Sequence, residues 1–269
     1  MITATYELVY SIPERIGEIK LLVARASAAK DKDESFYDAL GRASAVLLAA
    51  HLEAFLKEVS TNIIADLNYH LQDFSKMPEA LKREFCYKIA FYAGVEQREI
   101  DKRIKQLMVF FNKNSVDIDL SAFKYVENTN KNPSVDLIQA SLSKVGVPNI
   151  LHSIGGNDFT SVFDGNSRTD WVMRRKLKRS VSSLHSFPFR SLGSVFSFER
   201  AKPGKGQTTL WHEYVEAVMT RRHSIVHGDT IENTSSATEL GRDAEKLLVL
   251  MYGLAFSVST WFAESGTKS

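Results

Sequence analysis

The longest regular pattern in the chain is a helical stretch from about residue 34 to residue 71. Apolar side chains recur in it every three to four residues and form one stripe: Leu48, Leu52, Phe55, Val59 and Ile63. Four alanines beside the stripe would let another backbone approach closely: Ala43, Ala45, Ala49 and Ala50. Because such a stripe must be covered by other elements, the pattern favours a helical bundle.

Start signals and apolar spacing predict further helices on both sides of this stretch. Proline marks helix starts near residues 12, 78 and 133, and a capping box at Ser236 precedes a last helix that reaches about Phe262. The pattern weakens over residues 112–132 and again over residues 147–206. We therefore predict an all-α helical bundle, one domain over residues 1–269, with a long loop in the first segment and an irregular insertion in the second.

Composition narrows the class of protein. The net charge of +2 is too small to identify a nucleic-acid binder by itself. The single cysteine, Cys86, rules out an internal disulfide and fits a reducing compartment. No signal peptide is visible, and the longest apolar stretch, residues 247–258, is shorter than the ~20 residues of a membrane span. We expect a cytoplasmic protein without membrane contact.

The residues best suited to chemistry gather at the end of another predicted helix. Arg221, Arg222, His223 and His227 lie within seven positions, directly before Gly228. The helix would end at this glycine, because glycine enters the left-handed cap conformation without steric cost. The two histidines are four apart and share a face, whereas Arg222 and His227 are five apart and diverge. A ligand that contacts both must therefore lie at the helix end.

These residues also admit other interpretations. A helix C-terminus attracts arginine and histidine through its dipole alone. His223 and His227 have the spacing of helical zinc ligands. However, Ser224 stands where a metalloprotease needs glutamate, and neither a cysteine nor a third histidine lies nearby. We expect neither a metal nor another cofactor.

Two further groups of charged residues are candidates for a supporting role. Glu53 lies beside the apolar stripe, so it is either a surface residue at the stripe's edge or the partner of Arg42, Arg221 or Arg222. The densest basic run is either an exposed helix face or a surface that contacts backbone phosphates. This run contains Arg174, Arg175, Lys176, Lys178 and Arg179.

Arg222, four intervening residues, His227 and a following glycine resemble the Arg-x4–6-His motif of the HEPN superfamily. Within it, the chain is similar to the RiboL-PSP HEPN proteins over about residues 36–262. Their N-terminal helix pattern is matched by Arg42-Ala43-Ser44 with Glu53, and their Asn-Pro step by Asn132-Pro133. One departure is His223, which stands where the family usually has another polar residue, often asparagine.

The resemblance implies an all-α bundle that forms a homodimer, with the motif helices of both protomers lining one composite cleft. Family members are typically metal-independent RNA endonucleases, often toxins or antiviral effectors. Others only bind RNA or a protein partner, and a toxin would require an antitoxin or a defence-system partner. Gly228 and Asp229 are expected to support the site.

The residues fit cleavage of RNA at its 2′-hydroxyl. Histidine can act as base or acid at neutral pH, and arginine stays protonated and binds phosphate oxygens. We expect His227 to transfer the proton, Arg222 to stabilise the developing charge, and His223 to be the complementary acid or base. Arg221 would hold backbone phosphate or pair with Glu53. The product would carry a 2′,3′-cyclic phosphate.

Overall fold

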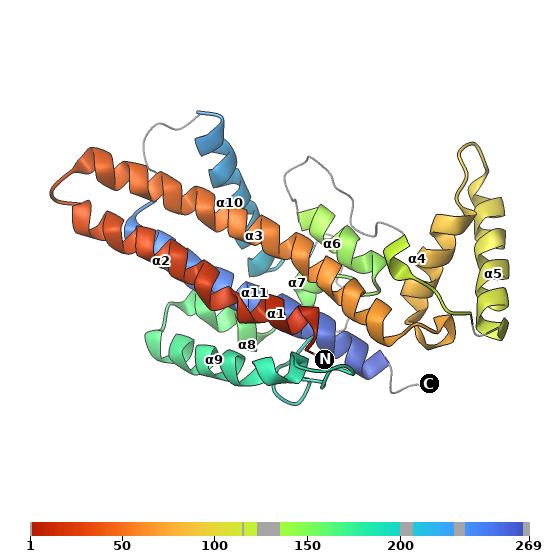
Figure 1. Cartoon of the computed structure of the whole chain (residues 1–269). Helices are drawn as coiled ribbons and strands as arrows, with labels where there is room; N and C mark the ends of the chain where they lie inside the picture. Colours follow the sequence, from red (N-terminus) through yellow and green to blue (C-terminus); the bar gives the residue numbers. More distant parts are fainter. Residues whose placement is uncertain (1, 115, 123–134, 200–206, 229–234, 266–269) are drawn as a thin grey trace.

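The computed structural model describes residues 2–114, 116–122, 135–199, 207–228 and 235–265. Three long helices lie side by side at its centre, and the others are arranged around them (Figure 1). They are α2 (Ile12–Ala29), α3 (Glu34–His70) and α11 (Ala237–Ser265). The described ranges contain no β-strand, only one isolated bridge between Asp73 and Asp117. The predicted all-α fold is confirmed.

The central helices form because their apolar residues recur at helical spacing. The predicted stripe of α3 is at most 1% exposed at all five of its positions, Leu48 to Ile63. The side chain of Asp33 accepts a hydrogen bond from the Phe36 amide (2.9 Å) and caps the start of α3. The predicted capping box starts α11, where the Ser236 amide donates to Glu239 over 2.7 Å.

The helix α11 is the most buried element, and every residue from 249 to 260 is buried. Both α3 and α11 are long and apolar enough to cross a membrane by length and composition alone. The core helix of a globular bundle passes the same test, and 83% of the apolar stretch of α11 is buried against the rest of the chain.

The remaining N-terminal elements extend the bundle. Helix α1 (Ala4–Tyr10) packs on α3, and Asp66 of α3 accepts hydrogen bonds from the first amides of α1, those of Ala4 and Thr5 (2.7 and 2.9 Å). The other elements gather around one end of α3: η1 (Phe74–Lys76), α4 (Glu79–Ala90), α5 (Gln97–Asn114), η2 (Leu120–Ala122) and α6 (Val135–Lys144). Residues 123–134, with the Asn132-Pro133 step, lie outside the described residues.

Residues 147–199, the described part of the segment 147–206 that was expected to be an irregular insertion, are more regular than predicted. This part contains α7 (Ile150–Ser153), α8 (Asn157–Thr160), η3 (Ser161–Asp164), α9 (Ser167–Ser180) and η4 (Val181–Leu184). Its aromatic side chains enter the core, where Phe159 and Phe196 stack with ring centroids 5.1 Å apart. Residues 147–199 are therefore part of the bundle.

Helix α10 (Leu210–Val226) packs on α3 and is fixed at its N-terminal end. Trp211 is fully buried, and its indole N–H donates to the Ile154 carbonyl (2.9 Å). The opposite end of α10 lies at the margin of the bundle, shown in blue in Figure 1. The fold thus anchors one end of α10 and leaves the other end accessible.

Candidate active site at the end of helix α10

The last turn of α10 ends as the sequence predicts. The final helical residue is Val226, and His227 is the cap residue, whose amide donates to the His223 carbonyl (3.0 Å). Gly228 follows with φ +76°, in the left-handed region that favours glycine. The chain therefore turns away from the helix axis directly after the second histidine.

The two histidines lie against each other on the solvent side of α10. The ring centroids of His223 and His227 are 4.2 Å apart with an interplanar angle of 46°, and both residues are exposed. Arg222, one residue before His223 and five before His227, is half-buried. An exposed pair of imidazoles can supply both a proton acceptor and a proton donor, and a guanidinium at the same end of the helix supplies a fixed positive charge.

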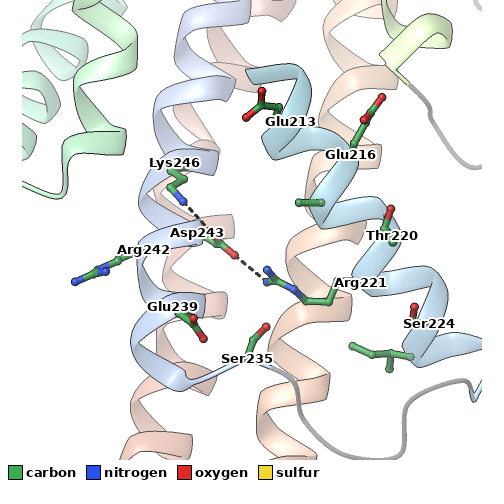
Figure 2. Close-up of a pocket in the computed structure, with 12 residues that line it drawn as sticks. Glu213, Glu216, Thr220, Arg221, Ser224, Ser235, Glu239, Arg242, Asp243 and Lys246 are labelled. Carbon is green, nitrogen blue, oxygen red and sulfur yellow. Dashed lines mark hydrogen bonds and ion pairs between the residues drawn. The ribbon is translucent and has the colours of Figure 1, made fainter. Parts of the chain in front are cut away.

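Arg221 points away from this end and toward α11 (Figure 2). Its Nη1 atom lies 2.8 Å from Oδ2 of Asp243, while Nζ of Lys246 lies 3.2 Å from the other carboxylate oxygen. The Tyr214 hydroxyl donates to the Asp243 carbonyl (2.7 Å). The expected pairing of Arg221 with Glu53 is therefore wrong, because a buried carboxylate on α11 lies closer.

Asp243 is the site residue that the sequence analysis missed. Its side chain is 10% exposed and joins two cations from two helices. A signal was present: Asp243 lies between Leu240 and Leu247, within the predicted core face of the last helix. A carboxylate in such a position needs a cationic partner, since an unpaired buried charge is strongly destabilising.

Glu53 forms an ion pair within α3: its Oε1 atom lies 2.9 Å from Nζ of Lys57, one turn along that helix. Its side chain is 23% exposed, which matches the simpler interpretation of a residue at the edge of the stripe. Arg42 lies nearer to the candidate site. It lines a shallow groove together with Ile225 of α10. Of the two N-terminal candidates, the structure therefore brings Arg42 to α10.

The groove between α10 and α11 does not suit a polyanion. Three cations and four carboxylates line it: Arg221, Arg242, Lys246, Glu213, Glu216, Glu239 and Asp243. Figure 2 shows Arg221 and Lys246 directed to Asp243, whereas Arg242 points away from α10. The excess of carboxylates and the ion pairs leave little positive charge for a phosphate chain.

The groove beside Arg42 has a different chemistry, because it is almost entirely apolar. Its other lining residues come from α2, α3 and α10: Leu22, Ala43, Val46, Leu47, Ala50 and Ile225. Next to it, Val226 of α10 is 55% exposed. An apolar surface of this kind adjoins the end of α10.

The cations of the basic run on α9 make different kinds of contact. Arg174 pairs with Glu245 (3.3 Å), and Lys176 pairs with Asp158 (3.0 Å). Arg175 lies over the Trp171 ring, 5.3 Å from its centroid. The last two cations, Lys178 and Arg179, line a separate pocket. The run is therefore not one uniform phosphate-binding surface.

Two candidates remain to be placed. Asp229 lies outside the described residues. Among the residues that are described, no group of three or more histidine, cysteine, aspartate or glutamate side chains has the arrangement of a metal site, and His223 and His227 are only two such ligands.

The fold and the helix end together define an all-α bundle that carries an arginine and two histidines at the accessible end of one helix. The chain belongs to the RiboL-PSP-HEPN family, whose family model matches residues 11–255. At the level of the family, this makes it a HEPN-type nuclease or RNA-binding module. Neither a search of curated proteins nor a search of solved structures finds a significant match.

Proposed function

We propose that the protein is a metal-independent endoribonuclease whose active site is the end of α10. The observation that carries this proposal is the exposed contact of His223 with His227, 4.2 Å between ring centroids, at the end of the helix that also bears Arg222. The departure from the usual family pattern, His223, contributes the second imidazole of this contact. It therefore adds a group that can transfer a proton.

The reaction is a transesterification at the 2′-hydroxyl of RNA. His227 accepts the hydroxyl proton, the 2′-oxygen attacks the adjacent phosphorus, and Arg222 stabilises the charge of the five-coordinate phosphorane. The bond to the 5′-oxygen then breaks, and a protonated imidazole, His223 or a histidine of a second copy, gives that oxygen its proton. The products are a 2′,3′-cyclic phosphate and a 5′-hydroxyl.

A second copy of the chain completes the proposed cleft. The apolar groove that contains Ala50 and Ile225 adjoins the end of α10, as does the exposed Val226. Exposed apolar surface of this kind is typical of a site where another protein surface packs. A two-fold arrangement through this surface would bring two copies of the histidine pair together.

Incubation of the purified protein with RNA in EDTA tests the chemistry. We expect cleavage to persist in EDTA and to leave 2′,3′-cyclic phosphate ends. His227→Ala should reduce the rate by about 10²–10⁴-fold, the usual contribution of a general acid or base. The thermal midpoint should stay unchanged, because His227 is exposed.

His70→Ala is the matched control, since His70 lies at the far end of α3 and stacks on Phe187 (5.0 Å). This variant should cleave RNA at the parent rate. Parent-like cleavage by His227→Ala, or complete loss of activity in EDTA, would contradict the proposal.

A second candidate function is RNA or partner binding without catalysis. It is favoured by the engagement of Arg221 with Asp243, which withdraws one cation from the helix end. In that case the parent would bind RNA without cutting it, and His227→Ala would bind equally well. Measurement of binding and cleavage on the same RNA separates the two candidates.

We also propose a biological setting, a toxin or antiviral defence effector that acts on RNA in the cytoplasm. An uncontrolled ribonuclease stops growth, so it would need an antitoxin or defence-system partner that restrains it. Induced expression of the parent should arrest growth, whereas His227→Ala should not. Equal growth of both strains, at equal protein levels, would count against this role.

A further inference from the structure

A second pocket lies between α1, the end of α9 and η4, apart from the helix end described above. In Figure 1, α9 and α10 lie on opposite sides of the long helices. The residues that line the pocket include these aromatic and basic side chains: Tyr6, Tyr10, Lys178, Arg179, His185 and Arg190. This combination differs from the groove beside α10, where ion pairs dominate.

The walls of the pocket are joined by hydrogen bonds. The Thr3 hydroxyl donates to the Leu184 carbonyl (2.5 Å), and the Thr3 amide donates to the His185 carbonyl (3.3 Å). The Thr5 hydroxyl donates to Asp66 of α3 (2.6 Å). The N-terminal helix is therefore fixed both to η4 and to the core.

The aromatic wall offers a face for stacking. Tyr10 is 73% exposed, although a tyrosine ring is a large apolar group. Its ring lies nearly parallel to that of Tyr6, with centroids 6.1 Å apart and an interplanar angle of 25°, and His185 packs edge-on against Tyr6 (5.1 Å). A planar ligand on Tyr10 would therefore extend an existing stack.

The basic wall consists of Lys178, Arg179 and Arg190. Within the described part of the chain, Lys178 and Arg179 form no ion pair, whereas Arg174 and Lys176 on the same helix both do. Arg190 is fixed by a hydrogen bond from its Nη2 atom to the Ser182 carbonyl (2.9 Å). The pocket thus keeps positive charge directed at solvent beside an aromatic face.

We propose that this pocket binds nucleotides of single-stranded RNA, with a base stacked on Tyr10 and backbone phosphates at Lys178 and Arg179. A nucleotide can contact both walls at once, because its flat base stacks on the aromatic wall and its phosphate, a few bonds away, binds the basic wall. Glu7 and Glu14 also line the pocket and can accept hydrogen bonds from a base amino group or a ribose hydroxyl. An acidic peptide would use the cations but leave the ring of Tyr10 uncovered.

The inference rests on the proposed function only in its choice of RNA as the ligand. The pocket is formed by α1, α9 and η4, and Figure 1 shows α9 and α10 on opposite sides of the long helices, so the pocket would hold nucleotides away from the cleaved linkage. Binding at the pocket and cleavage at the helix end can therefore be measured separately.

The test uses the full chain with His227→Ala, so that the RNA stays intact, and a short fluorescein-labelled oligouridylate read by anisotropy. Adding Tyr10→Ala should weaken binding about five- to a hundredfold, the range for loss of one stacked base. Adding Lys178→Gln with Arg179→Gln should lower the slope of log affinity against log salt by about 0.7 for each lost phosphate contact.

Matched controls come from the other end of the bundle. Tyr92 is 70% exposed, close to the value for Tyr10, so Tyr92→Ala should bind as the parent does. Lys102→Gln with Arg103→Gln removes the same charge from α5 and should leave the salt slope unchanged. Equal affinity of the Tyr10→Ala and Tyr92→Ala proteins for the oligonucleotide would overturn the inference. Full displacement of the oligonucleotide from the protein by equimolar inorganic polyphosphate would overturn it as well, because polyphosphate has no base to stack on Tyr10.

The two proposals fail in different ways. If the protein with His227 intact does not cleave RNA but binding still depends on Tyr10, the pocket stands and the ribonuclease proposal falls. If the protein cleaves RNA but Tyr10→Ala binds it as tightly as the parent does, the pocket proposal falls and the active site stands.

Discussion

At the scale of single residues, one glycine determines where the candidate active site ends. Gly228 has φ +76°, and a Cβ added there would meet no atom of the described residues within 4 Å. Within this part of the chain, a side chain at position 228 would thus be opposed only by the backbone conformation. Since His227 directly precedes it, any change of this conformation moves the proposed catalytic ring.

We expect Gly228→Ala to lower the free energy of unfolding by about 1 kcal/mol, because the left-handed conformation disfavours alanine by that amount. Cleavage should fall as well, since the cap residue would shift. Urea unfolding and a cleavage assay on the same protein measure the two effects.

Gly17→Ala is the matched control, because Gly17 lies inside α2 and is equally open, with no atom of the described ranges within 4 Å of an added Cβ. Here alanine should raise the free energy of unfolding by about 0.5–1 kcal/mol, since helical alanine is favoured over glycine. Equal effects of the two substitutions would show that Gly228 is not required by its conformation.

At the scale of elements, the position of α10 depends on its ion pair with α11. Arg221 and Lys246 both contact Asp243, and Tyr214 donates to the backbone of the same residue. These contacts join α10 to α11 at Tyr214, in the first half of α10, and at Arg221, two residues before His223. The candidate site is thus held in place by a carboxylate on another helix.

Replacement of Asp243 by asparagine should lower the free energy of unfolding by about 1–3 kcal/mol, because two cations would lose a shared carboxylate in a mostly buried place. Cleavage should fall with it, since α10 would be held less firmly. Glu216→Gln, exposed in the same groove, should change stability by less than about 0.5 kcal/mol. An effect of Glu216→Gln as large as that of Asp243→Asn would contradict this explanation.

A second link, between α8 and α9, makes stability depend on pH. Burial acts to raise the pKa of Asp158, but the hydrogen bond from the Ser197 amide (2.9 Å) and the Lys176 ammonium outweigh it and hold the pKa below its usual value. Because the folded pKa is the lower one, ionised Asp158 stabilises the fold above about pH 4. This contribution is lost as the pH falls through the folded pKa.

Asp158→Asn should therefore be less stable than the parent at pH 7, and the difference should shrink at pH 3. Thermal unfolding at both values measures it. Asp31→Asn, in the exposed turn after α2, should unfold at the same temperature as the parent at both pH values. A difference between Asp158→Asn and the parent that is the same at pH 7 and pH 3 would show that the charge of Asp158 is not its cause.

At the scale of the whole molecule, the proposed dimer depends on the apolar groove beside α10. Its small residues, Ala43 and Ala50, are exposed on α3 although they lie next to a buried stripe. A surface of small side chains permits close approach of another helix, which is what a composite cleft requires. The proposed function therefore predicts a protein that is active only as a pair.

Ala50→Glu should convert the protein to a monomer and abolish cleavage, because a charge would enter the middle of the proposed interface. The fold should persist, since Ala50 is exposed and glutamate is a good helix former. Ala65→Glu, on an exposed face at the other end of α3, should stay dimeric and active. Sedimentation equilibrium measures the oligomeric state of both variants, and circular dichroism measures whether they are folded. An active monomer would contradict the composite cleft.

Much of the fold was determined by the sequence alone, because helices depend on neighbours three and four residues apart. The spacing of Leu48, Leu52 and Phe55 predicted the central helix, Ser236 and Glu239 predicted the start of α11, and Gly228 predicted the end of α10. Each of these signals acts within one or two turns of chain, so no knowledge of the other helices was needed.

The partners of the charged side chains were decided only by the tertiary structure. Arg221 lies 22 positions from Asp243 in the chain, and Tyr10 lies far from Arg179, yet each pair shares a groove or a pocket. The sequence shows which groups need a partner, but helix packing determines which group comes within 3 Å. For that reason the histidine pair was predicted from its spacing, whereas the anchor at Asp243 and the pocket at Tyr10 emerged only from the folded chain.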